Sequence, residues 1–82
     1  MKLVEMPEYL VKEVVSNPDM VTVKEFPSEN EKEVVVTVLV DESDLGRVIG
    51  KAGKTANAIR VLVQASSYLQ DNKRVKINIE NF

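Results

Sequence analysis

Small and cationic side chains meet between residues 46 and 60 in a pattern suited to binding an anion. The chain has three glycines, and all of them, Gly46, Gly50 and Gly53, fall within eight positions. Glycine is costly inside regular structure, so this cluster indicates a place where the backbone turns tightly or meets a ligand closely. The cationic residues within and beside the cluster are Arg47, Lys51, Lys54 and Arg60. These residue types together predict that the segment binds phosphate.

The charges of the chain are distributed unevenly around this cluster. Residues 1–44 carry four basic and eleven acidic side chains, whereas residues 45–70 carry four basic side chains and no acid. The net charge of −2 therefore conceals a positive segment on an acidic body. Such a surface attracts polyanions locally, while the surrounding acid discourages indiscriminate binding.

Composition excludes several classes of function. The chain has 82 residues with no cysteine and no histidine, which removes thiolate chemistry, most zinc sites and the commonest general base. A chain of this length forms one small domain, over residues 1–82, without room for a deep catalytic cavity. We therefore expect no enzyme, no metal or other cofactor and no small-molecule substrate. No segment approaches the roughly 18 apolar residues of a membrane span, so we expect a cytoplasmic protein with no membrane partner.

The first half of the chain predicts a helix followed by a β-hairpin. Apolar residues recur at helical spacing up to about Ser16, and the Asn17-Pro18 pair ends the helix. Residues 20–26 and 33–40 are rich in β-branched side chains and are separated by turn-forming residues, which predicts two antiparallel strands. The second strand is a near-continuous valine run and is expected to be buried on both faces. The apolar stripe of the helix includes Leu3, Met6, Leu10 and Val14.

The second half predicts two helices and a last strand. Asp41 is a candidate N-cap for a short helix over residues 42–49, in which Gly46 is expected to be a close-packing position. A longer helix begins near Gly53 and runs to about Gln70, and residues 74–80 alternate as a strand. The predicted order is thus α-β-β-α-α-β. The stripe of the long helix expected to face inward is Ala56, Ile59, Leu62, Val63, Ser66 and Leu69, while Tyr68 and Phe82 are expected to be packing residues.

The four residues between these two helices, Gly50-Lys51-Ala52-Gly53, are suited to holding a phosphodiester backbone. The ends of this loop lack a Cβ, so a ligand can lie directly against the main chain. Free amides at the start of the long helix, at the positive end of its dipole, favour phosphate there. A bare Gly-x-x-Gly is most often only a helix cap and turn, but here it carries a lysine and joins two helices.

This segment resembles the signature of the KH domain, an Ile-Gly-x-x-Gly turn between two helices of a β-α-α-β core. The turn reads Ile49-Gly50-Lys51-Ala52-Gly53 in this chain. With a helix and a strand placed before the core, the order of elements is similar to the type II, or prokaryotic, KH arrangement. The chain as a whole resembles the small bacterial KhpA-type RNA-binding proteins.

The resemblance implies an α+β fold, a single type II KH-like domain with helices packed on one face of a three-stranded sheet. It also implies a cleft for about four nucleotides of single-stranded RNA, with the backbone clamped by the loop and the bases over an apolar surface. It further implies a bacterial post-transcriptional regulator or RNA chaperone that forms a homodimer or a heteromer with a second KH protein. The implied RNA-binding residues are Arg47, Val48, Ile49, Gly50, Lys51, Ala52, Gly53, Lys54, Asn57 and Arg60.

Other classes of function remain to be compared with this one. Gly53-Lys54-Thr55 imitates the end of a P-loop, but the motif needs a glycine where this chain has Val48. A winged helix-turn-helix DNA-binding module is a second possibility, although the apolar long helix is expected to lie on the sheet and not in a DNA groove. The third is a protein-interaction module that uses the same face.

Overall fold

The structure is a computed structural model that describes residues 5–82 of the chain. Within this range the α-helices and strands follow the predicted order α-β-β-α-α-β. Their bounds are α1 Glu5–Val14, β1 Thr22–Pro27, β2 Glu33–Val40, α2 Leu45–Ile49, α3 Lys54–Gln70 and β3 Arg74–Asn81. Leu3, which the spacing assigned to the first helix, lies outside the described residues.

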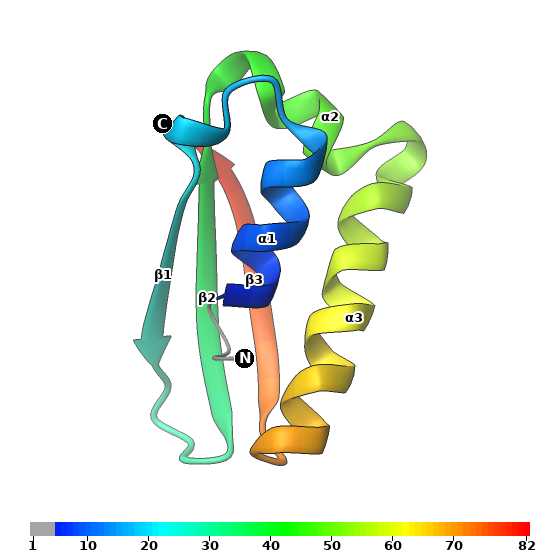
Figure 1. Ribbon diagram of the computed structural model, residues 1–82. Coiled ribbons are helices and arrows are strands. Elements are labelled where there is room, and N and C mark those ends of the chain that lie inside the picture. The colour runs from blue at the N-terminus through cyan, green and yellow to red at the C-terminus, as the bar shows by residue number, and fades with distance from the viewer. Residues whose placement is uncertain (1–4) are drawn as a thin grey trace.

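The three strands form one mixed sheet with β2 at its centre. β2 runs antiparallel to β1 and parallel to β3. The parallel connection passes through α2 and α3, which lie with α1 on one face of the sheet (Figure 1). The turn between α2 and α3 is at one end of the molecule, and the β1–β2 hairpin is at the opposite end (Figure 1). The α+β class and the packing of the helices on one face agree with the prediction.

The valines of β2 form the centre of the core. Val34, Val36, Val38 and Val40 are buried, and the residues between them are only half buried. Side chains alternate between the two faces of a strand, so the buried set faces the helices. The expectation that β2 is buried on both faces is therefore wrong, because helices cover only one of them. The valine run reflects strand propensity as well as burial.

The long helix α3 packs on the sheet through a narrower stripe than predicted. Ala56, Ile59 and Val63 are buried as expected, and Ser67 joins them. Leu62 is 50% exposed and Leu69 is 89% exposed, so their assignment to the inward stripe is wrong. The prediction counted every apolar residue at helical spacing, but one sheet face contacts only about a third of the helix circumference.

The segment before α2 is held by Asp44 and not by the predicted N-cap. The Asp41 side chain caps no backbone amide and instead accepts hydrogen bonds from Ser43 Oγ and Asn17 Nδ2. Asp44 is almost fully buried and accepts hydrogen bonds from the backbone amides of Ser16 and Asn17, both at 3.0 Å. The carboxylate therefore joins the end of the α1 segment to the start of α2.

These contacts lower the pKa of Asp44. The backbone hydrogen bond from Ser16 lowers the pKa most. Burial opposes this by raising the pKa, while the hydrogen bonds from Asn17 and the charge of Arg47 lower it further. A carboxyl whose pKa is lower in the folded state stabilises the fold above its unfolded pKa. This contribution is lost as the pH falls through the folded value.

We predict that Asp44→Asn lowers the melting temperature at pH 7 by several degrees, because the uncharged amide is a weaker acceptor for two backbone donors. The gap between wild type and variant should begin to narrow as the pH falls below about 4, where Asp44 becomes protonated in the unfolded chain, and should narrow further as the pH falls through the lower pKa of the folded state. Circular dichroism melts across pH 2.5–7 would measure this, with the exposed substitution Asp19→Asn as control. A gap that does not change with pH would contradict the assigned role of the carboxylate.

Candidate nucleic-acid interface

The turn between α2 and α3 has a left-handed backbone. α2 ends where the Gly50 amide donates to the Gly46 carbonyl at 2.9 Å. Gly50 and Gly53 both have φ of 75°, and Ala52 has φ of 55°. The 3₁₀ segment η3, Lys51–Gly53, is closed by a 3.2 Å hydrogen bond from the Gly53 amide to the Gly50 carbonyl. The main chain is thus turned tightly at the start of α3.

Gly50 is required by the fold itself. A Cβ at this position would lie 2.3 Å from Thr55 Oγ1 and 2.9 Å from the Thr55 backbone nitrogen. Its positive φ would add conformational strain for any other residue. Gly50 therefore lets the chain pass closely over the first turn of α3.

Gly53 and Gly46 leave open surface instead. The Gly53 Cβ position is 4.0 Å from Asn57 Nδ2, so only its positive φ requires glycine. Gly46 is exposed in a regular helix, and no described atom outside its own helix backbone and neighbouring residues lies within 4 Å of its Cβ position. The prediction that Gly46 is a close-packing position is wrong. A helical glycine costs about 1 kcal/mol relative to alanine, and at this position it leaves the surface of α2 bare.

The cations predicted for the site are exposed at this end of the molecule. Arg47, Lys51, Lys54 and Arg60 are all on the surface. Over residues 5–82 none of them forms an ion pair, since the one salt bridge found there joins Lys12 and Glu8. Arg60 Nη1 contacts Asn57 Oδ1 at 3.4 Å, which brings these two predicted site residues together. Arg60 Nε also donates to the Ile77 carbonyl at 3.5 Å, and the charge of Arg47 acts on Asp44, but no ion pair in the described residues neutralises any of the four cations.

The two apolar candidates differ in position. Val48 is completely buried in the core, so it packs and has no surface with which to contact a nucleotide. Ile49 is 39% exposed, directly before Gly50. The structure therefore places Ile49, but not Val48, on the surface beside the loop.

A groove that the prediction missed continues from Arg60 along α3 and the edge of β3, with a volume of about 790 Å³. Gln64 bridges its two walls, because its side chain accepts a hydrogen bond from the Val75 amide and donates one to the Lys73 carbonyl. Tyr68 lines the groove and is more than half exposed. Phe82 is exposed as well, so the expectation that these two aromatic residues pack in the core is wrong. The i, i+4 spacing of Arg60, Gln64 and Tyr68 was the signal in the sequence.

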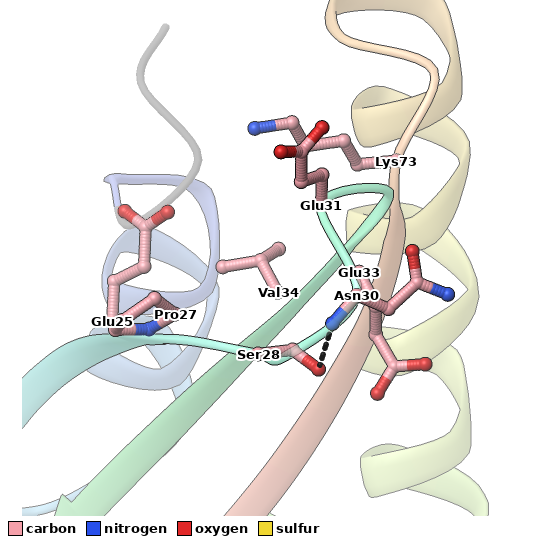
Figure 2. Close-up of a pocket in the computed structure, with 8 residues that line it drawn as sticks. All are labelled: Glu25, Pro27, Ser28, Asn30, Glu31, Glu33, Val34 and Lys73. Carbon is pink, nitrogen blue, oxygen red and sulfur yellow. Dashed lines mark hydrogen bonds between the residues drawn. The ribbon is translucent and has the colours of Figure 1, made fainter.

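A second hollow, of about 440 Å³, lies at the hairpin end and is unsuited to an anion. Glu25, Glu31 and Glu33 line it together with Lys73, as Figure 2 shows. Its acidic character would repel phosphate. Across residues 5–82, no group of acidic side chains is close enough to hold a metal ion.

We predict that alanine has different effects at the two glycines of the loop. Gly50→Ala should lower the free energy of unfolding by more than about 2 kcal/mol, because strain and the clash with Thr55 add together. Gly53→Ala should cost about 1 kcal/mol, from strain alone. Urea denaturation followed by circular dichroism would measure both. Equal losses would contradict the division between a glycine required by packing and one required only by its φ angle.

No helix in the described part of the chain is long and apolar enough to cross a membrane.

Comparison with known proteins agrees with this geometry. A family profile described as "KhpA/KhpB, KH domain" matches residues 5–79. The chain is 39% identical over 75 residues to the RNA-binding protein KhpA of Caldanaerobacter subterraneus subsp. tengcongensis, covering 92% of this chain and 96% of that protein. It is 44% identical over 63 residues to the RNA-binding protein KhpA of Aquifex aeolicus, covering 77% of each. These names describe RNA-binding proteins and not enzymes, in agreement with the prediction.

The fold is also similar to part of a larger protein. Era from Aquifex aeolicus, crystallised with GDP and aluminium fluoride, superposes with a TM-score of 0.71 at 19% identity. The match covers 98% of this chain and 30% of the Era chain, and it supports the fold alone. From the family match and the close relatives, the chain belongs to the KhpA/KhpB family of KH-domain proteins.

Proposed function

We propose that this chain binds single-stranded RNA, with the RNA backbone at the Gly50–Gly53 loop and the bases along the groove between α3 and β3. The observation that carries the proposal is that the groove between α3 and β3 continues from the loop. Bare main chain and unpaired cations lie at the loop, and the groove begins at Arg60. The loop alone could hold any phosphate, but the groove beside it fits a polymer that carries bases.

The loop supplies charge and main-chain contact to the RNA backbone. Lys51 and Lys54 are exposed on either side of Gly53, where a phosphate can approach without meeting a Cβ. Gly53 is the N-cap of α3 and provides no side-chain cap, so the first amides of the helix are free to donate to phosphate oxygens. Arg47 and Ile49 border the same approach from α2.

The groove supplies contacts to unpaired bases. β3 is an edge strand. The amide of Arg74 donates to the carbonyl of Lys32, directly before β2, and the amide of Phe82 donates to the Val40 carbonyl at the end of β2. Because backbone groups alternate along a strand, the amide of Ile77 points away from β2, toward the groove. This donor can pair with a base edge, and the exposed ring of Tyr68 can stack on a base. Single-stranded loops and ends of RNA present bases in this way, whereas a duplex hides them.

The relatives support this assignment. The curated relatives are named as RNA-binding proteins. Era, which shares the fold, has also been crystallised with nucleotides 1506–1542 of 16S ribosomal RNA.

A site for about four nucleotides gives only modest affinity, in the micromolar range. Such binding suits a cytoplasmic RNA chaperone or post-transcriptional regulator that samples many RNAs, and it favours pairing with a second KH domain in a homodimer or heteromer.

We predict that the double variant Lys51→Asp/Ala52→Asp loses at least tenfold in affinity for a single-stranded oligoribonucleotide. The aspartates would replace a positive loop with a repulsive one. The melting temperature should change little, because both residues are exposed and aspartate tolerates the positive φ of Ala52. Fluorescence anisotropy with a labelled octanucleotide of mixed sequence would measure the affinity.

The chain offers a matched control for this variant. Lys32→Asp/Asn72→Asp changes the net charge by the same amount, and Asn72 has a positive φ of 52° like that of Ala52. Both control residues are exposed, Lys32 between β1 and β2 and Asn72 between α3 and β3. These two connections lie at the end of the molecule opposite the loop (Figure 1). The control should keep most of the RNA affinity. Equal losses of RNA affinity in both double variants would contradict the proposed clamp, because they would show only an effect of net charge.

We predict that Gly46→Ala separates stability from binding. Alanine should stabilise α2 by up to about 1 kcal/mol, because the added methyl meets no described atom. The same methyl should weaken RNA binding several-fold if RNA lies against this surface. Thermal melts and anisotropy on the same samples would test both effects. An unchanged affinity would show that Gly46 lies outside the RNA path.

Two alternatives make different predictions in the same binding assay. A winged helix-turn-helix module would bind duplex DNA, so duplex competitor should displace the labelled RNA efficiently. A protein-interaction module would show no RNA affinity at all. The KH assignment predicts that single-stranded RNA competes strongly and duplex DNA poorly.

A further inference from the structure

The face of the sheet opposite the helices is open and presents a surface of its own. The helices lie on one side of the three strands, and no described element covers the other side (Figure 1). Val34, Val36 and Val38 of β2 are buried against the helices. Because side chains alternate along a strand, Val35 and Thr37 of β2 face the open side.

The register of the sheet identifies the residues at the centre of this open face. Residues directly opposite one another on neighbouring strands have their side chains on the same side of the sheet. Across β1, β2 and β3 they form two rows, Phe26–Val35–Lys76 and Lys24–Thr37–Asn78. We refer to these six residues as the open-face patch.

The open-face patch combines an aromatic ring with two cations and contains no acid. Phe26 is 47% exposed. Lys24 and Lys76 are exposed, and no ion pair in the described residues neutralises either of them. Thr37 and Asn78 are half buried and add hydrogen-bonding groups. Rings that stack on bases, next to cations that contact phosphate, are the groups by which protein surfaces bind single-stranded RNA.

Acidic residues limit the patch at both ends. The next row toward the hairpin contains Glu33 opposite Arg74, and the next row in the other direction contains Leu39 opposite Glu80. Neighbouring rows are about 7 Å apart, because two residues of a strand separate them. The acid-free surface is therefore short, with room for about two nucleotides.

β3 connects the open-face patch to the groove. Arg74, Lys76 and Asn78 line the groove at α3, and Lys76 and Asn78 are also members of the patch. β3 is an edge strand, so no further strand separates the groove from the open face. An RNA that leaves the groove at Arg74 and Lys76 can pass over β3 without leaving a cationic surface.

We propose that RNA longer than about four nucleotides continues from the groove over β3 and binds the open-face patch, with one base stacked on Phe26. Phosphates of this segment contact Lys24 and Lys76. The inference rests on the proposed function, because the loop and the groove anchor the RNA. Once the strand is anchored, its contact with the patch is intramolecular, so even a weak contact raises the apparent affinity.

The double variant Lys24→Gln/Phe26→Ala tests the patch, because both residues are on β1, at the edge of the sheet away from β3 and the groove. Its affinity for a single-stranded decanucleotide of mixed sequence should fall at least fivefold, because one stacking contact and one phosphate contact are lost. Its affinity for a tetranucleotide, which fills only the loop and the groove, should not change. Fluorescence anisotropy would measure the affinities, and circular dichroism melts would check that the variant folds.

α1 offers a matched control on the helical side of the sheet. Tyr9→Ala/Lys12→Gln also removes one exposed aromatic ring and one lysine. This control should keep the wild-type affinity for both RNAs. Variants are compared at a fixed RNA length because a longer RNA can bind in more registers, which raises its affinity whatever surface it contacts.

Backbone amide shifts in ¹H–¹⁵N spectra give a second readout. The decanucleotide should shift the amides of Lys24, Phe26 and Thr37, whereas the tetranucleotide should leave them unchanged. Unshifted amides at these positions, or a loss of affinity that is the same for both RNA lengths, would overturn the contact with the open face. Binding at the loop would then stand.

Other outcomes bear on the anchor. A wild type that binds neither RNA would overturn the proposed function together with this inference. Wild-type affinity of Lys51→Asp/Ala52→Asp for the decanucleotide would also overturn both, because the loop would not hold the RNA. Loss of decanucleotide affinity in the loop variant and in the patch variant, with tetranucleotide affinity lost only in the loop variant, is the result that the proposal predicts.

Discussion

Positive φ angles at Gly50, Ala52 and Gly53 turn the chain sharply between α2 and α3, and the rest of the site depends on this turn. It can form because Gly50 has no Cβ to meet Thr55. Ala52 adopts its left-handed conformation at a cost of about 1–2 kcal/mol, which the packing of α2 and α3 on the sheet must offset. The turn places bare main chain, two lysines and the first amides of α3 on one exposed end of the molecule.

Positive and negative side chains are concentrated at opposite ends of the fold. The four cations of the candidate site lie on α2, the loop and the first half of α3, whereas the hollow at the hairpin end is lined by three glutamates and one lysine. A protein with a net charge of −2 can therefore present a positive site to RNA and repel it elsewhere. α3 connects these ends, and its uncharged second half offers one flank to the groove.

Local patterns predicted the elements, and long-range contacts explain what they missed. Alternation, helical spacing and turn residues gave strands and helices close to those observed, and the loop with its cations stood out. The apolar period of α3 could not separate Ile59 and Val63, which contact the sheet, from Leu62 and Leu69, which do not. Asp41 was the expected helix cap, but Asp44 holds this segment, and its amide partners, Ser16 and Asn17, are more than 25 positions away in sequence. The groove at Tyr68 and the open surface at Gly46 also depend on tertiary packing.

The most direct test of RNA binding at this site is a ¹H–¹⁵N NMR titration with a short single-stranded oligoribonucleotide. We predict the largest shifts at the amides of Gly46 and residues 51–55, with further shifts along the groove at Gln64 and Ile77. Residues on the open face of the sheet, such as Lys24 and Thr37, should change little. Shifts centred on that open face, with the loop unchanged, would contradict the account.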